Sequence, residues 1–262
     1  MRESLFDGFL PTVSCMSRCN ELIRTTTSEG LYYLENYRIP DALMFENTSV
    51  CNLRCEHCFN SYISGDTVSL EDTERVAKEL SDNNIKAIHL FKYGDPFADA
   101  GVNEKIQILR KPNPKLEIYT STNGALLHLR DNFEAALQLN QIVFSLDGID
   151  NKSAEIFQKG QSFQQTFNNM SELIRRRDEG HHENLRIVWK YVLFPHNDSD
   201  EYIKKAITMA EDIGVDSIQF FLGFNVGKRS GAIWKSEAFL PYMKKYEFVS
   251  DDWKSHFVLK LR

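Results

Sequence analysis

The chain has no long apolar run and no long basic run, and these two absences limit where the protein can reside and what it can bind. No apolar stretch approaches the roughly 20 residues that a membrane-spanning helix needs, and acidic residues stand near the N-terminus where a signal peptide would be basic. The net charge is −6, with Arg175-Arg176-Arg177 as the one notable basic cluster. We therefore expect a cytoplasmic protein that binds neither membranes nor nucleic acid.

Cysteine is scarce and unevenly placed, with 5 residues in all and none after Cys58. An odd number, with three cysteines inside eight residues, suits metal ligation in a reducing compartment better than a disulfide framework. Hydrophobic residues make up 42% of the 262 positions and charged residues 26%, which allows a sizeable core and a polar surface. The sequence therefore reads as a globular protein with one metal-binding segment.

From about residue 43 the chain alternates short β-branched runs with longer amphipathic runs, which predicts βα units around a parallel sheet. The expected strands are Leu43–Thr48, Ala87–Phe91, Leu116–Ser121, Gln141–Leu146, Leu185–Leu193 and Ser217–Leu222. Six such units favour an α/β fold of the incomplete (β/α)6 barrel type, because eight are needed for ordinary closure. A doubly wound open sheet is the alternative. We expect an N-terminal cap at 1–42, the partial barrel at 43–224 and a C-terminal extension at 225–262.

Helix boundaries are marked by capping residues. Ser69 and Asp72 resemble a capping box that opens a helix running to Leu80. A later helix with Ile203 and Ile207 on one face should end at Gly214, a natural C-terminal cap.

The segment Cys51-Asn52-Leu53-Arg54-Cys55-Glu56-His57-Cys58 follows directly on the first expected strand. Loops at the carboxyl ends of parallel strands carry the chemistry of such folds. Three thiolates in one short loop can converge on a single metal centre, and soft sulfur ligands suit zinc or an iron–sulfur cluster. A structural zinc site that uses His57 as fourth ligand is the plainer alternative, although zinc loops usually supply two separated pairs. Three unrelated core cysteines are a further alternative.

This C-x3-C-x2-C spacing after a first strand resembles the signature of the radical S-adenosylmethionine (SAM) superfamily. The resemblance implies that Cys51, Cys55 and Cys58 bind three irons of a [4Fe–4S] cluster. It also implies that the fourth iron takes the amino and carboxylate groups of SAM. An electron from the cluster would then cleave SAM to methionine and a 5′-deoxyadenosyl radical, which abstracts a substrate hydrogen. An electron donor such as flavodoxin or ferredoxin is implied as a partner.

Further segments agree with the family's motif order along successive strands. Tyr93-Gly94-Asp95-Pro96 is similar to the Gly-Gly-Glu-Pro motif that receives the SAM amino group, but Tyr93 and Asp95 depart from it; an ordinary turn is the alternative. Ser121-Thr122-Asn123-Gly124 looks like the family's Thr-Asn-Gly segment, and Ser145-Leu146-Asp147-Gly148 resembles an element near the SAM ribose or the substrate. The resemblance therefore implies that Thr122, Asn123, Ser145 and Asp147 lie at the cofactor.

Three other residues are weaker candidates for cofactor contacts. Lys190 on the fifth expected strand either points inward to a carboxylate or faces solvent. Phe221 could pack against adenine, although aromatic side chains on such a strand usually fill the core. His57 occupies the aromatic position of the family motif and should present its backbone to adenine rather than bind iron.

The stretch Trp189–Phe194 with the Tyr-Gly-Asp-Pro-Phe motif resembles a subgroup associated with glycosyltransferases and carbohydrate biosynthesis. Most of that subgroup carries a cysteine-rich C-terminal domain for auxiliary clusters, and the absence of cysteine after Cys58 excludes such clusters from the sequence that follows it. We expect oxidation or epimerisation of a sugar, a sugar nucleotide or a related small polar substrate. Radical modification of a ribosomally made peptide is the alternative, and a non-catalytic, metal-stabilised binding module is a second one.

Cys15 and Cys19 are the two cysteines outside the motif, and they are spaced i, i+4. On a helix they would share one face, so an epimerase could use one of them to return a hydrogen atom to the substrate radical. The simpler interpretation is that they are small buried apolar residues.

Overall fold

The computed structural model describes residues 41–56, 58, 60, 65–222, 249–250 and 256–260, all of which belong to one unit, Asp41–Arg262. Of the helices in these ranges, none combines the length and the apolar character that crossing a bilayer requires. The expected cap at 1–42 lies almost wholly outside the described residues, and so does most of the expected extension at 225–262. Both domain assignments remain predictions.

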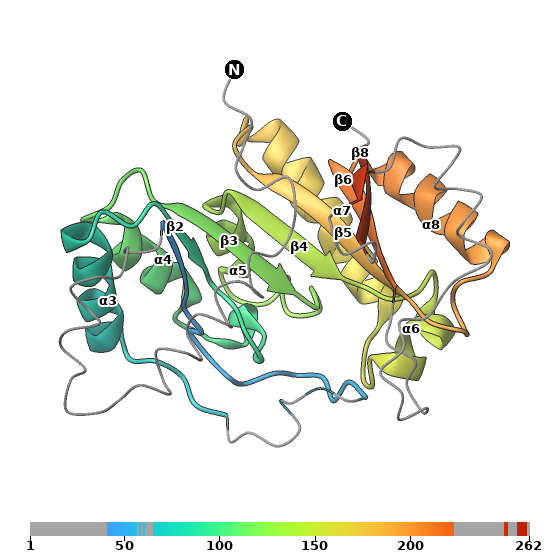
Figure 1. Ribbon diagram of the computed structural model, residues 1–262, viewed down its shortest axis with the longest axis horizontal. Helices are drawn as coiled ribbons and strands as arrows, with labels where there is room; N and C mark the ends of the chain where they lie inside the picture. Colours follow the sequence, from blue (N-terminus) through green and yellow to red (C-terminus); the bar gives the residue numbers. More distant parts are fainter. Residues whose placement is uncertain are drawn as a thin grey trace. The chain divides into compact units, whose positions relative to one another are not determined.

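One sheet runs through the unit in the order β1-β2-β3-β4-β5-β6-β8-β7 (Figure 1). Six neighbouring strands are parallel, namely β1 (Ala42–Met44), β2 (Ala87–His89), β3 (Glu117–Thr122), β4 (Gln141–Ser145), β5 (Arg186–Leu193) and β6 (Ser217–Leu222). Two antiparallel strands follow, β8 (His256–Lys260) against β6 and β7 (Val249–Ser250) against β8. Since β1 and β7 stand at the two ends of this order, the described sheet is open.

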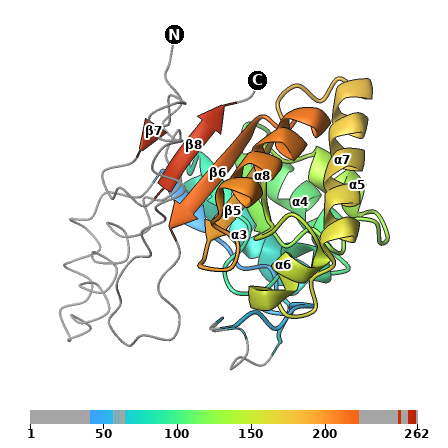
Figure 2. The same cartoon turned by 90° about the vertical axis from the view of Figure 1, so that its right-hand side faces the viewer.

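Helices follow the parallel strands and gather on one face of the sheet (Figure 2). They are α3 (Leu70–Asp82), α4 (Val102–Arg110), α5 (Asn132–Leu137), α6 (Asn151–Phe157), α7 (Phe163–Glu179) and α8 (Asp200–Ile213), with a short 3₁₀ turn η2 (Pro96–Ala98) after β2. The expected N-cap at Ser69 and C-cap at Gly214 are confirmed, although the Asp72 carboxylate accepts the Ser69 hydroxyl rather than the Ser69 N–H of a full capping box. The Ser69 hydroxyl accepts the Asp72 N–H at 3.0 Å and donates to its carboxylate at 2.8 Å, and Gly214 ends α8 with φ 77°.

The two faces of the sheet differ in character. Trp189 on β5 is fully buried against the rings of Phe163 and Phe167 on α7. Because side chains alternate along a strand, Lys190 faces away from the helices. The parallel register aligns Lys190 with Ser145 on β4 and Gln219 on β6. The face opposite the described helices, called the inner face below, therefore carries a polar row.

The expectation of an incomplete (β/α)6 barrel is confirmed by these six parallel strands and their one-sided helices. The structure shifts some limits, most of all at β1, which ends at Met44 rather than at Thr48. Beyond Met44 the chain runs as a loop pinned by side chains, and Thr48 forms only an isolated bridge with Thr67. Strands β7 and β8 fall within the expected C-terminal extension and were not anticipated.

Candidate functional site

The cysteine loop follows β1 at the carboxyl edge of the parallel sheet, where the sequence places it. Cys51, Cys55 and Cys58 are each partly exposed and carry free thiols. Buried Leu53 anchors the loop from inside. Two backbone hydrogen bonds fix its other side to the chain around the end of α6, Arg54 N–H to Lys159 O at 3.0 Å and Glu56 N–H to Phe157 O at 2.9 Å. The loop is thus held in place by contacts that do not involve the thiols.

The three thiols lie close enough to influence one another electrostatically. Burial raises the pKa of Cys55 to about 12, and the charges of the other two thiols add to the rise. Burial also raises the pKa of Cys51, although the Leu53 N–H, 3.5 Å from its Sγ, acts in the opposite direction. Because thiolates are the form that binds metal, a bound cation must displace these protons.

Among the described residues, no three His, Cys, Asp or Glu side chains are arranged to hold a single metal ion. A cubane cluster makes a different demand, because each of three thiolates binds its own iron. Three soft sulfur donors in one anchored loop fit that demand.

The Tyr93–Asp95 segment follows β2 and lies against the loop after β1. One carboxylate oxygen of Glu46 accepts the N–H groups of Tyr93 at 2.6 Å and of Gly94 at 3.1 Å. A Cβ on Gly94 would stand 2.1 Å from the carbonyl oxygen of Thr48. Glycine is therefore required here by the protein's own backbone, and Glu46 is a positioning residue that no sequence motif marked.

Asp95 is 3% exposed, and its carboxylate links its own turn to the end of β3. One oxygen accepts the Thr122 hydroxyl and the Asn123 N–H, both at 2.8 Å, and the other accepts the Phe97 N–H at 3.1 Å. Burial raises the pKa of Asp95, and these hydrogen bonds counter that rise. Since a carboxylate has about four acceptor positions, roughly one is left for a ligand.

Asp147 continues the site at the end of β4 and is 3% exposed. Its carboxylate accepts the Val192 N–H at 2.7 Å, while its own N–H donates to the Gln158 side chain at 3.0 Å. Burial raises the pKa of Asp147 to about 6, against the effects of the Lys190 ammonium and the Val192 N–H. The carboxylate is therefore buried from water, with the Lys190 ammonium close enough to favour its charged form.

Lys190 lies on the inner face, as one of the two sequence interpretations expected. Burial lowers its pKa, and the charges of Asp147 and Cys55 oppose that change. Its Nζ stands 5.8 Å from the ring centre of Phe221, so both residues reach the same region. Within the described part of the chain, no hydrogen bond or ion pair to this ammonium is found.

The polar row continues to both sides of Lys190. The Ser145 hydroxyl lies 3.2 Å from that of Ser121, and on β6 Gln219 is 6% exposed with its side-chain oxygen lacking a partner among the described residues. Gln219, like Gln158, carries no motif and was missed from the sequence.

The structure brings most sequence candidates to one edge of the sheet: the three cysteines, Tyr93, Gly94, Asp95, Thr122, Asn123, Ser145, Asp147, Lys190 and Phe221. His57, Cys15 and Cys19 lie outside the described residues, and their roles stay predictions.

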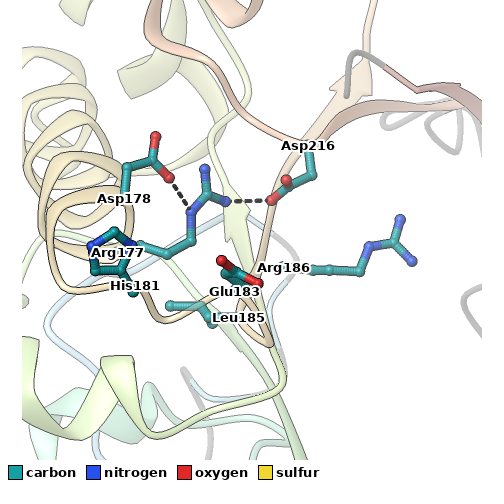
Figure 3. Close-up of a pocket in the computed structure, with 7 residues that line it drawn as sticks. All are labelled: Arg177, Asp178, His181, Glu183, Leu185, Arg186 and Asp216. Atoms are coloured by element: carbon teal, nitrogen blue, oxygen red, sulfur yellow. Dashed lines mark hydrogen bonds and ion pairs between the residues drawn. The ribbon is translucent and has the colours of Figure 1, made fainter.

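A separate depression of about 360 Å³ lies at the amino ends of β5 and β6 (Figure 3). Buried Arg177 bridges Asp178 at 2.8 Å and Asp216 at 2.6 Å there, and Asp216 also accepts the Ile187 N–H. These pairs tie α7 to the starts of two strands. Because the cysteine loop follows the carboxyl end of β1, the depression belongs to the opposite end of the sheet.

Comparison with known proteins gives one family match, in which residues 46–210 fit the model of the radical SAM superfamily. The AlbA protein of Bacillus subtilis, described as an antilisterial bacteriocin subtilosin biosynthesis protein, is 30% identical over 54% of this chain and 32% of its own length. A probable GTP 3′,8-cyclase of Methanocella arvoryzae is 29% identical over 42% of this chain and 35% of its own. The matched part therefore spans about a third of each curated relative.

Among solved structures, Streptococcus suis SuiB bound to its precursor peptide SuiA superposes with a TM-score of 0.57. The identity is 15%, and the match covers 82% of this chain and 46% of SuiB. At that identity the likeness concerns the fold.

Proposed function

Because the chain belongs to the radical SAM superfamily, whose members use a [4Fe–4S] cluster and SAM, we propose that Cys51, Cys55 and Cys58 hold this cluster and that the protein abstracts hydrogen from a polar substrate. The observation that carries the proposal is the anchored loop with three thiols at the carboxyl edge of the sheet. When bound, the cluster and SAM supply one-electron cleavage of SAM and the hydrogen-abstracting radical. The chain's own residues bind and orient the cofactor and the substrate, and they exclude water from the site.

The SAM site is proposed to run from the Tyr93–Asp95 turn to the end of β4. Asp95 keeps roughly one acceptor position, which suits the SAM ammonium. The ammonium of Lys190 suits a carboxylate, either that of SAM or one on the substrate. Thr122 and Asn123 hold Asp95, Ser145 and Asp147 border the ribose or the substrate, and Phe221 and the His57 backbone border adenine.

For the substrate we now favour a peptide over the sugar or sugar nucleotide expected from the sequence. One relative is described by its role in bacteriocin biosynthesis, and a protein of like fold binds a precursor peptide. The comparisons give no support to a sugar. On the inner face, the Gln219 side-chain oxygen next to Lys190 lacks a partner among the described residues and can accept a peptide N–H.

The reaction is proposed to be an oxidation or an epimerisation, supplied with electrons by a flavodoxin or ferredoxin. In an epimerisation, Cys15 or Cys19 would return the hydrogen atom. A hydrogen atom returned from a thiol would carry solvent deuterium into the product, so full turnover with label in the Cys15→Ala, Cys19→Ala double variant would rule this donor out.

The substrate class is tested by anaerobic incubation of the reconstituted protein with SAM, dithionite and either a peptide library or a panel of nucleotide sugars. We expect peptides, and not sugars, to accelerate 5′-deoxyadenosine formation above the substrate-free rate. Acceleration by nucleotide sugars alone would return the assignment to carbohydrate chemistry. A Lys190→Met variant, run in parallel, should lose the acceleration because the ammonium that would meet a carboxylate is gone.

A further inference from the structure

The side chain of Asn123 is an oriented hydrogen-bond donor aimed at the cysteine loop. Its Nδ2 lies 2.9 Å from Asn52 Oδ1 and 3.7 Å from Cys51 Sγ, within the range of N–H···S hydrogen bonds. Its Oδ1 accepts the Ala125 N–H at 3.0 Å. Because the Ala125 N–H can only donate, the amide oxygen of Asn123 must face Ala125, and the NH₂ group must face the cysteine loop.

The backbone of Asn123 is fixed as firmly as its amide. Its N–H donates to Asp95, and its carbonyl oxygen accepts the side chains of Gln161 and Thr166, each at 3.0 Å. The residue is 8% exposed. A donor held by this many partners gives up little conformational freedom when it binds sulfur, so its effect on Cys51 is set in advance.

Cys51 is singled out among the three thiols by the donors around it. Its Sγ receives both the Asn123 amide and the Leu53 N–H. In the described residues, no hydrogen bond from another residue reaches the Sγ of Cys55 or Cys58. Among the described residues, the hydrogen-bond donors at the three sulfurs are therefore unequally distributed, with two at Cys51.

Resting on the proposed cluster ligation, we propose that Asn123 is a positioning and tuning residue that raises the reduction potential of the [4Fe–4S] cluster through its N–H···S hydrogen bond to Cys51. Reduction from the 2+ to the 1+ state adds one electron from an external donor and moves no proton. The added charge is shared with the cysteine sulfurs, and hydrogen bonds to those sulfurs stabilise the more negative state. Losing the donor should make the cluster harder to reduce.

The experiment is an EPR-monitored redox titration, without SAM, of wild type, Asn123→Ala and Asn123→Asp, each reconstituted anaerobically and assayed for iron and sulfide. Dithionite supplies the electrons. At the wild-type midpoint, the reduced-to-oxidised ratio should fall about three- to tenfold in Asn123→Ala, where tenfold corresponds to about 59 mV for a one-electron couple. Asn123→Asp, which keeps the size and the Ala125 contact but adds negative charge, should shift at least as far in the same direction.

Asn52→Ala is the matched control. It breaks the Asn123–Asn52 link but leaves the donor to Cys51, so its potential should equal that of wild type. Equal potentials in all fully loaded proteins would overturn the proposal, as would an equal shift in Asn52→Ala. If both Asn123 variants stay folded yet fail to hold a cluster, Asn123 acts in assembly and the proposal is also wrong. Failure of the wild type to take up iron would instead refute the cluster assignment itself.

Discussion

Replacing Asp147 with asparagine should stabilise the cluster-free protein at neutral pH and change its stability little below pH 4. Asp147 is 3% exposed, and burial raises its pKa to about 6 despite the nearby Lys190 ammonium. In an unfolded chain an aspartate has a pKa of about 3.9. The folded state therefore binds the proton more tightly than the unfolded state does.

The direction of the effect follows from this difference. The stability associated with protonated Asp147 is fully present below about pH 4 and is lost as the pH rises through about 6. Two pKa units correspond to about 3 kcal/mol. The asparagine of the variant cannot ionise, and its amide oxygen can still accept the Val192 N–H that Asp147 accepts at 2.7 Å. The variant should thus gain up to about 3 kcal/mol over wild type between pH 4 and pH 7.

The assay is urea unfolding of cluster-free wild type and Asp147→Asn at several pH values. Asp212→Asn, on the exposed side of α8, is the control and should track wild type throughout. A stability difference that does not change with pH, or a variant less stable than wild type at pH 7, would refute the reasoning.

Three further predictions follow from local geometry. Gly94→Ala should destabilise the fold by at least about 2 kcal/mol, because its Cβ would stand 2.1 Å from the Thr48 carbonyl oxygen. Gly101→Ala is the control, because the nearest atom to its Cβ would be an Asp99 carboxylate oxygen at 3.5 Å. Urea unfolding measures the stability of both variants. Lys105→Met should cost about 3–5 kcal/mol, because it removes the ammonium that pairs with the buried Asp99 carboxylate and leaves only the neutral donors Asn47 and Gly101 N–H. Lys78→Met on the exposed face of α3 should change little in the same assay. Asp95→Asn should keep its iron but weaken SAM binding about tenfold in equilibrium dialysis.

Each of these has a contrary outcome. Equal stability of the two glycine variants would mean that the backbone at Thr48 can move aside. Equal costs for Lys105→Met and Lys78→Met would mean that the Asp99 pair contributes no more than a surface pair. Unchanged SAM affinity in Asp95→Asn would make Asp95 purely a link between β2 and β3.

The strands and several caps were predictable because their signals are local. Alternating β-branched runs located β2 to β6, and Gly214 marked the end of α8 through its left-handed backbone. The C-x3-C-x2-C spacing located the cysteine loop for the same reason.

Contacts between distant segments were not predictable. Nothing around Glu46 indicates that its carboxylate meets the backbone of Tyr93 and Gly94, 47 and 48 positions away. Which way the Lys190 side chain points depends on which face of β5 packs on α7. Trp189 packs on α7, so the neighbouring Lys190 points to the other face. Strand β8 pairs antiparallel to β6, and no βα rhythm precedes it.

The group that the cysteine loop binds decides the central claim most directly. Wild type and the single variants Cys51→Ala, Cys55→Ala and Cys58→Ala, reconstituted anaerobically, should be compared for iron, sulfide and zinc and then incubated with SAM and dithionite. We predict about four irons with matching sulfide and release of 5′-deoxyadenosine in wild type, and the loss of both in every variant. Stoichiometric zinc with no iron uptake and no 5′-deoxyadenosine in wild type would contradict the account.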